Sequence, residues 1–242
     1  MNNKQFVSFI TAGDPSIQKT KEFIDILAKY SDIIEIGLPF SDPIAEGEVI
    51  EAANIRALEN STTTDKIFDM LSDVTFEKMV ILTYMNPVFV YGCDKFFKKC
   101  NETGVYGVII PDLPYEERGE VLEYAKKYDV HLITLVAPTS EDRIKMLAKE
   151  AAGFIYLVSS LGTTGIRSEF TVDLPKIVSQ IKEVTEIPVM IGFGISTPEQ
   201  AEIMRKIADG VIVGSAFVKI IAEHGENSND YIEKYIKSMV KF

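Results

Sequence analysis

The chain alternates eight times between a short apolar run and a segment with a helical repeat, and this alternation constrains the fold more than any other feature. Most of the apolar runs are continuous, which is typical of strands buried on both faces of a parallel sheet. The predicted strands cover residues 6–10, 32–36, 79–84, 105–110, 131–135, 153–158, 187–191 and 210–213. Eight strand-then-helix units in 242 residues predict an α/β fold, a closed (β/α)8 TIM barrel.

An open doubly wound sheet is the alternative for such an alternation. That fold would need a Gly-x-Gly-x-x-Gly turn after the first strand, whereas residues 11–14 read Thr-Ala-Gly-Asp. No linker or low-complexity segment divides the chain, so residues 1–242 are predicted to form one domain. Asp14-Pro15 and Thr197-Pro198 each place a capping residue before a proline, and they predict two helix starts.

Composition excludes several functional classes. The net charge of −11 argues against a nucleic-acid partner or an anionic membrane surface, and no apolar run approaches the roughly 20 residues of a membrane span. The two cysteines, Cys93 and Cys100, and the lack of a signal-peptide pattern predict a reduced, cytoplasmic protein. The two histidines, His131 and His224, share no metal-ligand spacing with the cysteines, so no metal site is expected.

In a barrel of this kind the ligand site lies at the carboxyl ends of the strands. Glycines follow the last two predicted strands there, at Gly194 and at Gly214-Ser215, where backbone N–H groups and a helix N-terminus could hold a phosphate. The segment after the sixth strand, residues 159–167, is rich in Gly and Thr and could close over a ligand. The alternative is that these glycines only permit tight turns.

A carboxylate stands inside the second predicted strand. Glu35 lies between Ile34 and Ile36, and if these isoleucines face the helices, Glu35 points into the barrel. Burial raises the pKa of a carboxyl group and suits it to proton transfer, so Glu35 is the candidate acid-base residue. The alternative is a structural ion pair with a buried Arg or Lys, although neither residue type occurs in the predicted strands.

Three aromatic residues stand near predicted strand ends: Phe9, Tyr84 and Tyr156. They could line a pocket for a flat apolar group beside the phosphate, and core packing is an equally good interpretation of each. Asp112 lies just after the fourth predicted strand, and support of a loop or a helix cap is favoured over catalysis for it.

Seven segments carry a resemblance to a known family. In chain order they read FITAGDPS, IIEIGLPFSDPIAEG, YMNPVFVYG, IIPDLPYEE, YLVSSLGTTG, IGFGIS and VIVGSAFVK. From Phe6 to about Ile221 the sequence resembles the alpha subunits of tryptophan synthase, and the glutamate followed by Gly-x-Pro-Phe-Ser-Asp-Pro is the most specific part. The resemblance implies a TIM barrel that cleaves indole-3-glycerol phosphate to indole and glyceraldehyde 3-phosphate by a retro-aldol reaction. Such an enzyme is a carbon–carbon lyase of L-tryptophan biosynthesis.

The resemblance also implies roles for individual residues. Glu35 matches the catalytic glutamate of the family, and Glu46 falls at the position of a second carboxylate, which meets the indole N–H. Thr164 matches a lid threonine that contacts this second carboxylate. The same resemblance implies phosphate ligands at Gly165, Gly194, Gly214 and Ser215, and indole-pocket residues at Phe9, Tyr84 and Tyr156.

Alpha subunits of this family work with a beta subunit that carries pyridoxal phosphate and condenses indole with serine, usually in an α2β2 assembly. The resemblance therefore implies a beta-subunit partner, which faces the loops after the second and sixth strands. It implies no cofactor in this chain.

Two departures from the family pattern bear on these expectations. The family usually reads Ala-Asp-Gly-Pro where this chain reads Ala45-Glu46-Gly47-Glu48, so the second carboxylate is one methylene longer and the loop loses a proline. The helix that usually precedes the first strand is expected to be missing, because few residues precede Phe6. A working lyase is the favoured interpretation. The alternatives are a subunit that mainly activates its partner and a related barrel that acts on another sugar phosphate.

Overall fold

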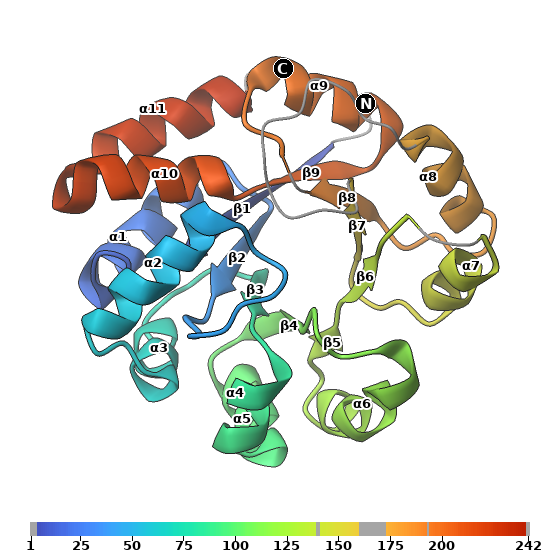
Figure 1. The fold of residues 1–242 in the computed structure, drawn as a ribbon, viewed down its shortest axis with the longest axis horizontal. Helices are drawn as coiled ribbons and strands as arrows, with labels where there is room; N and C mark the ends of the chain where they lie inside the picture. Colours follow the sequence, from blue (N-terminus) through green and yellow to red (C-terminus); the bar gives the residue numbers. More distant parts are fainter. Residues whose placement is uncertain (1–3, 139–140, 160–172, 193, 241–242) are drawn as a thin grey trace.

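A computed structural model of the chain describes residues 4–138, 141–159, 173–192 and 194–240. Its strands are β1 (Gln5–Thr11), β2 (Ile33–Gly37), β3 (Met79–Leu82), β4 (Val105–Ile109), β5 (His131–Leu132), β6 (Thr134–Val136), β7 (Ile155–Val158), β8 (Val189–Gly192) and β9 (Gly210–Val213). Its α-helices are α1 (Ile17–Leu27), α2 (Glu48–Glu59), α3 (Thr64–Leu71), α4 (Met85–Tyr91), α5 (Cys93–Glu102), α6 (Arg118–Lys127), α7 (Glu141–Lys149), α8 (Leu174–Lys182), α9 (Pro198–Ile207), α10 (Ser215–His224) and α11 (Asn229–Met239). Short 3-10 helices lie at Tyr115–Glu117 and Gly225–Asn227. The helices surround the strands (Figure 1), and in the described part of the chain none is long and apolar enough to cross a membrane.

The strands form a ring of parallel neighbours. Their order is β5-β4-β3-β2-β1-β9-β8-β7-β6. The two ends of this order are consecutive parts of the predicted strand 131–135, because β5 pairs with β4 and β6 pairs with β7. This segment therefore pairs on both sides in succession and closes the ring, which confirms the predicted (β/α)8 barrel. The extent of the domain, residues 1–242, stays a prediction.

Side chains alternate between the inside of the ring and the surrounding helices, as the two-residue period of a strand requires. The apolar cluster inside the ring consists of Val7, Ile33, Val80, Ile109, Ile133, Phe154, Tyr156, Met190 and Ile212. Ile34 and Ile36, the neighbours of Glu35 in β2, belong instead to the larger core between strands and helices. The strands thus supply two apolar cores, and this is why their sequences are continuous rather than alternating.

One of the two predicted helix starts is wrong. Helix α1 begins at Ile17, and Ser16 caps it with its side chain, so Asp14-Pro15 lies before the helix. Asp14 instead accepts two hydrogen bonds from the Arg56 guanidinium, at 2.9 and 2.7 Å, and this buried carboxylate joins the loop after β1 to α2. The start at Thr197-Pro198 is confirmed, because Thr197 opens α9 with a complete capping box.

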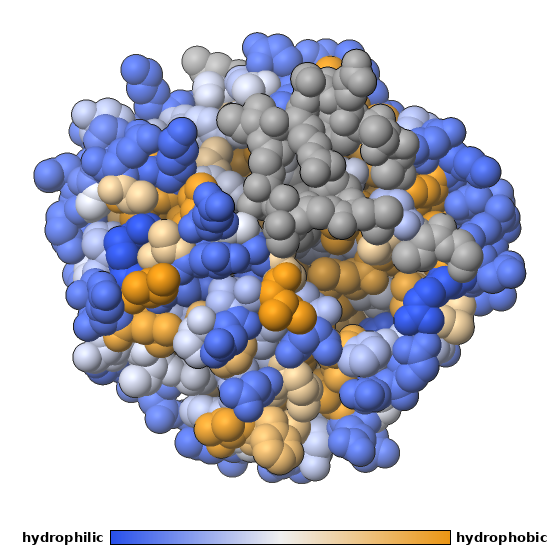
Figure 2. All heavy atoms as spheres, viewed as in Figure 1, coloured by the Kyte–Doolittle hydropathy of each residue, from blue (hydrophilic) through white to orange (hydrophobic). Residues whose placement is uncertain are grey.

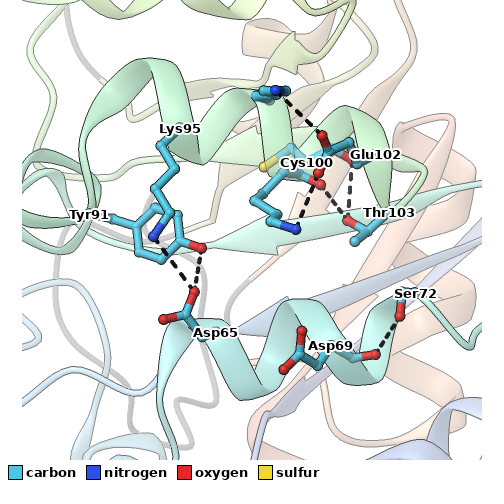
Figure 3. A network of polar contacts seen from close by, with 10 residues as sticks. Asp65, Asp69, Ser72, Tyr91, Lys95, Cys100, Glu102 and Thr103 are labelled. Carbon is cyan, nitrogen blue, oxygen red and sulfur yellow. Dashed lines mark hydrogen bonds and ion pairs between the residues drawn. The ribbon is translucent and has the colours of Figure 1, made fainter.

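A polar network on the outside of the barrel joins α3, α4 and α5 (Figure 3). Asp65 of α3 accepts a hydrogen bond from the Tyr91 hydroxyl of α4 at 2.6 Å and lies 3.8 Å from the Lys95 Nζ of α5. The Lys95 ammonium also lies 4.0 Å from the centre of the Tyr91 ring. These contacts fix the carboxyl end of α4, whose N-cap residue, Tyr84, reaches the functional site.

Candidate functional site

A cavity of about 540 Å³ opens where the strands reach their carboxyl ends. The described residues that line it are Phe9, Glu35, Ala45, Glu46, Glu48, Val49, Ile50, Leu82, Pro111, Leu135, Tyr156, Gly194, Ile195, Ser196, Ile212, Gly214, Ser215, Ala216, Lys219, Ile220, Glu223 and Tyr235. Six of the nine strands contribute a residue to this wall, and Pro111 and Gly194 lie two residues after the ends of β4 and β8. The cavity lies at the end of the barrel where the sequence predicts a ligand site.

Glu35 is a buried acid in the wall of this cavity. It lies in β2 between Phe9 of β1 and Val80 of β3, and it is 1% exposed. Its Oε2 has no hydrogen-bond partner, and no ion pair joins it to a basic side chain, among the residues that the structure describes. Burial, reinforced by the negative charge of Glu46, raises the pKa of Glu35 to about 8. The described residues therefore give no support to a structural ion pair at this position.

Glu46 lies in the loop between β2 and α2, which lies in front of β2 and β3 in Figure 1. It is 6% exposed, and the Tyr84 hydroxyl donates a hydrogen bond to its carboxylate. The backbone N–H of Ala45 donates to the same hydroxyl at 3.0 Å, so Tyr84 holds the loop at two points. Burial is the main cause that raises the pKa of Glu46, to about 7, and the negative charges of Glu51 and Asp112 act in the same direction.

Tyr84 was predicted to line the pocket, but the structure places it behind the cavity wall. It is not among the described residues that line the cavity; its ring packs on Phe40, with 5.3 Å between the ring centres, and its hydroxyl faces Glu46. Asp112 Oδ1 accepts a hydrogen bond of 2.9 Å from the backbone N–H of Met85, the first residue of α4. Asp112 thus has the capping role that was favoured for it, and it anchors the helix that Tyr84 opens.

Tyr84→Phe tests how the Glu46 carboxylate is held. The ring stays on Phe40, while Glu46 loses a donor and Ala45 an acceptor. Because an unmade buried hydrogen bond costs about 1–3 kcal/mol, we expect the free energy of unfolding to fall by about that amount in urea titrations. The pKa of Glu46 should also rise, because a hydrogen bond to the carboxylate favours the charged form; carbon-13 NMR of the carboxyl group measures it. Tyr231→Phe, at an exposed site, is the control, and an unchanged Glu46 pKa would contradict the arrangement.

The other two aromatic residues predicted for the pocket do lie in the cavity wall. Phe9 and Tyr156 are both buried and both line the cavity, as predicted, and Leu82 and Ile212 add aliphatic surface that the sequence analysis did not single out. Tyr156 lies so close to Gly192 that a Cβ on the glycine would stand 2.5 Å from the tyrosine hydroxyl. The glycine therefore makes room for the ring. This wall suits a flat apolar ligand group.

Gly194, Gly214 and Ser215 line the same cavity. Gly214 is the N-cap of α10 and Ser215 its first residue, and no side chain caps this end of the helix. Gly194 has a φ of +79°, a backbone conformation that favours glycine. An uncapped first turn presents backbone N–H groups, which are what a bound phosphate requires. The other two predicted residues, Thr164 and Gly165, lie outside the described residues.

The charged side chains in the described part of the cavity wall are four acids and one base. The acids are Glu35, Glu46, Glu48 and Glu223, and the base is Lys219. Lys219 was not predicted from the sequence, although it lies four residues after Ser215 and therefore on the same face of a helix. Among the described residues no group of three or more His, Cys, Asp or Glu side chains could hold a metal ion.

Comparison with known proteins gives matches over nearly the whole chain. A family model described as Tryptophan synthase alpha chain matches residues 1–242. The tryptophan synthase alpha chain of Lacticaseibacillus casei is 48% identical over 242 residues, which cover 98% of this chain and 91% of that protein. The alpha chain of Methanocaldococcus jannaschii is 43% identical over 227 residues, which cover 91% of this chain and 80% of that protein.

Solved structures of tryptophan synthase alpha subunits also match nearly the whole chain. The tryptophan synthase alpha subunit of Campylobacter jejuni matches with a TM-score of 0.89 and 36% identity, covering 99% of this chain and 96% of that one. A chain from the tryptophan synthase α2β2 complex of Pyrococcus furiosus matches with a TM-score of 0.87 and 31% identity, covering 98% of both chains.

Proposed function

The chain belongs to the tryptophan synthase alpha chain family, and from this premise we propose that it is the lyase that cleaves indole-3-glycerol phosphate to indole and glyceraldehyde 3-phosphate in L-tryptophan biosynthesis. The observation that carries the proposal is the cavity at the strand ends. One cavity wall joins the buried acid Glu35, the second carboxylate Glu46 and the uncapped end of α10. We also propose a cytoplasmic location, which the free thiols of Cys93 and Cys100 support.

We assign both proton transfers to Glu35. Cleavage needs a proton on indole C3 and the removal of a proton from the adjacent glycerol hydroxyl. With a pKa of about 8, Glu35 carries its proton at neutral pH and can donate it to C3. The resulting carboxylate then takes the hydroxyl proton while the carbon–carbon bond breaks and its electron pair returns to the indole ring. Glu35 ends the cycle protonated, and the glycerol fragment leaves as an aldehyde.

Glu46 acts in the same step, at the indole nitrogen. Protonation at C3 puts positive charge on the indole nitrogen, and an ionised Glu46 stabilises that charge. Glu35 is buried more deeply than Glu46, and only Glu46 accepts a hydrogen bond from Tyr84. Both differences favour ionisation of Glu46 while Glu35 still holds its proton, in the direction of the pKa values of about 7 and about 8. Environments that separate two carboxyl pKa values in this way give the two groups different roles.

The rest of the cavity holds the two ends of the substrate. Phe9 and Tyr156 provide apolar wall for the indole ring, and Gly194, Gly214 and Ser215 supply backbone N–H groups and a hydroxyl for the phosphate. The phosphate role of Gly165 and the lid role of Thr164 stay predictions from the resemblance.

As the partner we propose a tryptophan synthase beta subunit in an α2β2 assembly, with pyridoxal phosphate in that subunit and no cofactor in this chain. Exposed apolar side chains near the cavity support a protein partner: Ile44 is 71% exposed, Phe89 72% and Val90 77%. Ile44 precedes Ala45, which binds Tyr84 at the start of α4, and Phe89 and Val90 lie in α4. Figure 2 shows apolar atoms on this face over the position of α4.

Phe89→Asp should weaken binding of the beta subunit by at least about 10-fold, because a charge would be buried in the interface. The turnover of the isolated chain should not change. Titration calorimetry with the beta subunit measures the affinity. Ile203→Asp, which adds the same charge at an exposed isoleucine of α9, is the matched control. Equal affinities of the two variants would place the interface elsewhere.

Indole release from indole-3-glycerol phosphate tests the reaction, with and without the beta subunit. Turnover in either condition supports the lyase. No turnover in both conditions would overturn it. A chain without turnover that still accelerates conversion of serine and indole to tryptophan by the beta subunit would be an activating subunit. Turnover of another phosphosugar would instead identify a related barrel.

A further inference from the structure

Lys219 is the one basic side chain among the described residues that line the cavity. It lies in the second turn of α10 and is exposed. No hydrogen bond or ion pair joins it to another described residue, including Glu223, which lies four residues later on the same helix face. Its ammonium group is therefore uncommitted within the described part of the chain.

The geometry of a helix directs this side chain towards the uncapped end of α10. Side chains in an α-helix lean towards the N-terminus and cover the preceding turn. Lys219 therefore leans over the turn that begins at Ser215, four residues before it. One turn of helix rises about 5.4 Å, which a lysine side chain spans easily.

The acidic side chains of the cavity wall make a nearby cation useful for binding a phosphate. The described wall carries four acidic side chains, of which Glu35 is protonated at neutral pH, and the whole chain has a net charge of −11. The remaining negative charge repels a dianionic phosphate. The end of a helix supplies only about half an elementary positive charge. Lys219 can supply a full one beside it.

From these observations, and on the basis of the proposed function, we infer that Lys219 is the charge partner of the substrate phosphate. Its Nζ pairs with a phosphate oxygen that the backbone N–H groups of the Gly214–Ser215 turn leave free. This contact selects ligands that carry a dianionic phosphate ester over uncharged ligands. The phosphate is remote from the bond that breaks, so the contact is the same in the ground state and the transition state and affects KM rather than kcat.

Lys219→Met removes the charge and keeps the length of the side chain. We expect the KM for indole-3-glycerol phosphate and the Kd for glycerol 3-phosphate to rise about 5- to 20-fold at low salt, with kcat within about 2-fold of the parent. The rise should shrink in about 0.5 M NaCl, where charges are screened. Indole carries no phosphate, and its binding should not change. Lys219→Arg should restore most of the affinity for both phosphate ligands.

Lys234→Met is the matched control, because Lys234 is an exposed residue of α11 outside the cavity wall and the change in net charge is the same. An equal rise in KM for this control would assign the effect to net charge. An equal loss of indole binding in Lys219→Met would assign it to damage of the cavity. Either result, or unchanged phosphate affinity, would overturn the inference.

The two proposals fail separately. A parent protein that does not cleave indole-3-glycerol phosphate refutes the lyase, yet calorimetry with glycerol 3-phosphate still compares Lys219→Met with the parent. A parent that cleaves the substrate while Lys219→Met keeps the parent KM refutes only the role of Lys219. A parent that binds no glycerol 3-phosphate refutes the role of Lys219 as well.

Discussion

Glu35→Gln is expected to lower kcat for indole release by at least about 100-fold, because the amide keeps the size of the side chain but can neither donate nor accept the proton. The KM should change little, since the residues proposed to hold indole and phosphate remain. Steady-state indole release measures both constants. Glu223→Gln is the matched control: it neutralises another carboxylate of the cavity wall, and its kcat should stay within about 3-fold of the parent. Near-parental turnover of Glu35→Gln would remove Glu35 from the mechanism.

The same variant should be more stable than the parent at alkaline pH. The pKa of Glu35 rises from an ordinary value of 4.5 to about 8 in the folded protein, so the folded state binds the extra proton between these values. The free energy of unfolding of the parent therefore falls as pH rises through this window, by an amount of the order of a few kcal/mol at pH 8. A glutamine is neutral at every pH and removes this loss. Urea unfolding at about pH 5 and pH 8 measures it, and a variant that is both inactive and less stable would indicate damage to the fold.

The fold was predictable because burial on both faces leaves a strong local signal. Each parallel strand must be apolar towards the ring and towards the helices, so all eight predicted runs coincide with strands to within a few residues. The division of 131–135 into β5 and β6 was not predictable. It follows from pairing with β4 on one side and β7 on the other. The pattern of residues within the segment does not reveal these pairings, which close the ring.

The site was predictable in part for the same reason. The direction of Glu35 follows from the two-residue period of a strand, since Ile34 and Ile36 belong to the outer core. Contacts between distant segments left no such signal. Tyr84 binds Glu46 across 38 residues of sequence, and Asp14 binds Arg56 across 42, so a local capping rule misassigned Asp14.

Two substitutions at Glu46 separate charge from reach. Glu46→Gln keeps the length of the side chain but loses the negative charge that the indole nitrogen needs, and kcat should fall by about 100-fold, the scale of losing one electrostatic contact in a transition state. Glu46→Asp keeps the charge and withdraws it by one methylene, or roughly 1 Å, from the Tyr84 hydroxyl. We expect it to lose less than about 10-fold in the same indole-release measurement. An aspartate variant as slow as the glutamine variant would mean that the length of this side chain matters as much as its charge.

The pH dependence of kcat/KM decides whether Glu46 acts as a charge. In the parent, kcat/KM should rise as Glu46 ionises near pH 7 and fall as Glu35 loses its proton near pH 8, which gives a narrow bell. Glu46→Gln cannot ionise at this position, so the acid limb should disappear. The alkaline limb should move to lower pH, because the negative charge of Glu46 is one cause of the raised pKa of Glu35. In Glu46→Asp both limbs should remain. An acid limb that persists in Glu46→Gln would belong to another group, and Glu46 would then have no electrostatic part in the cleavage.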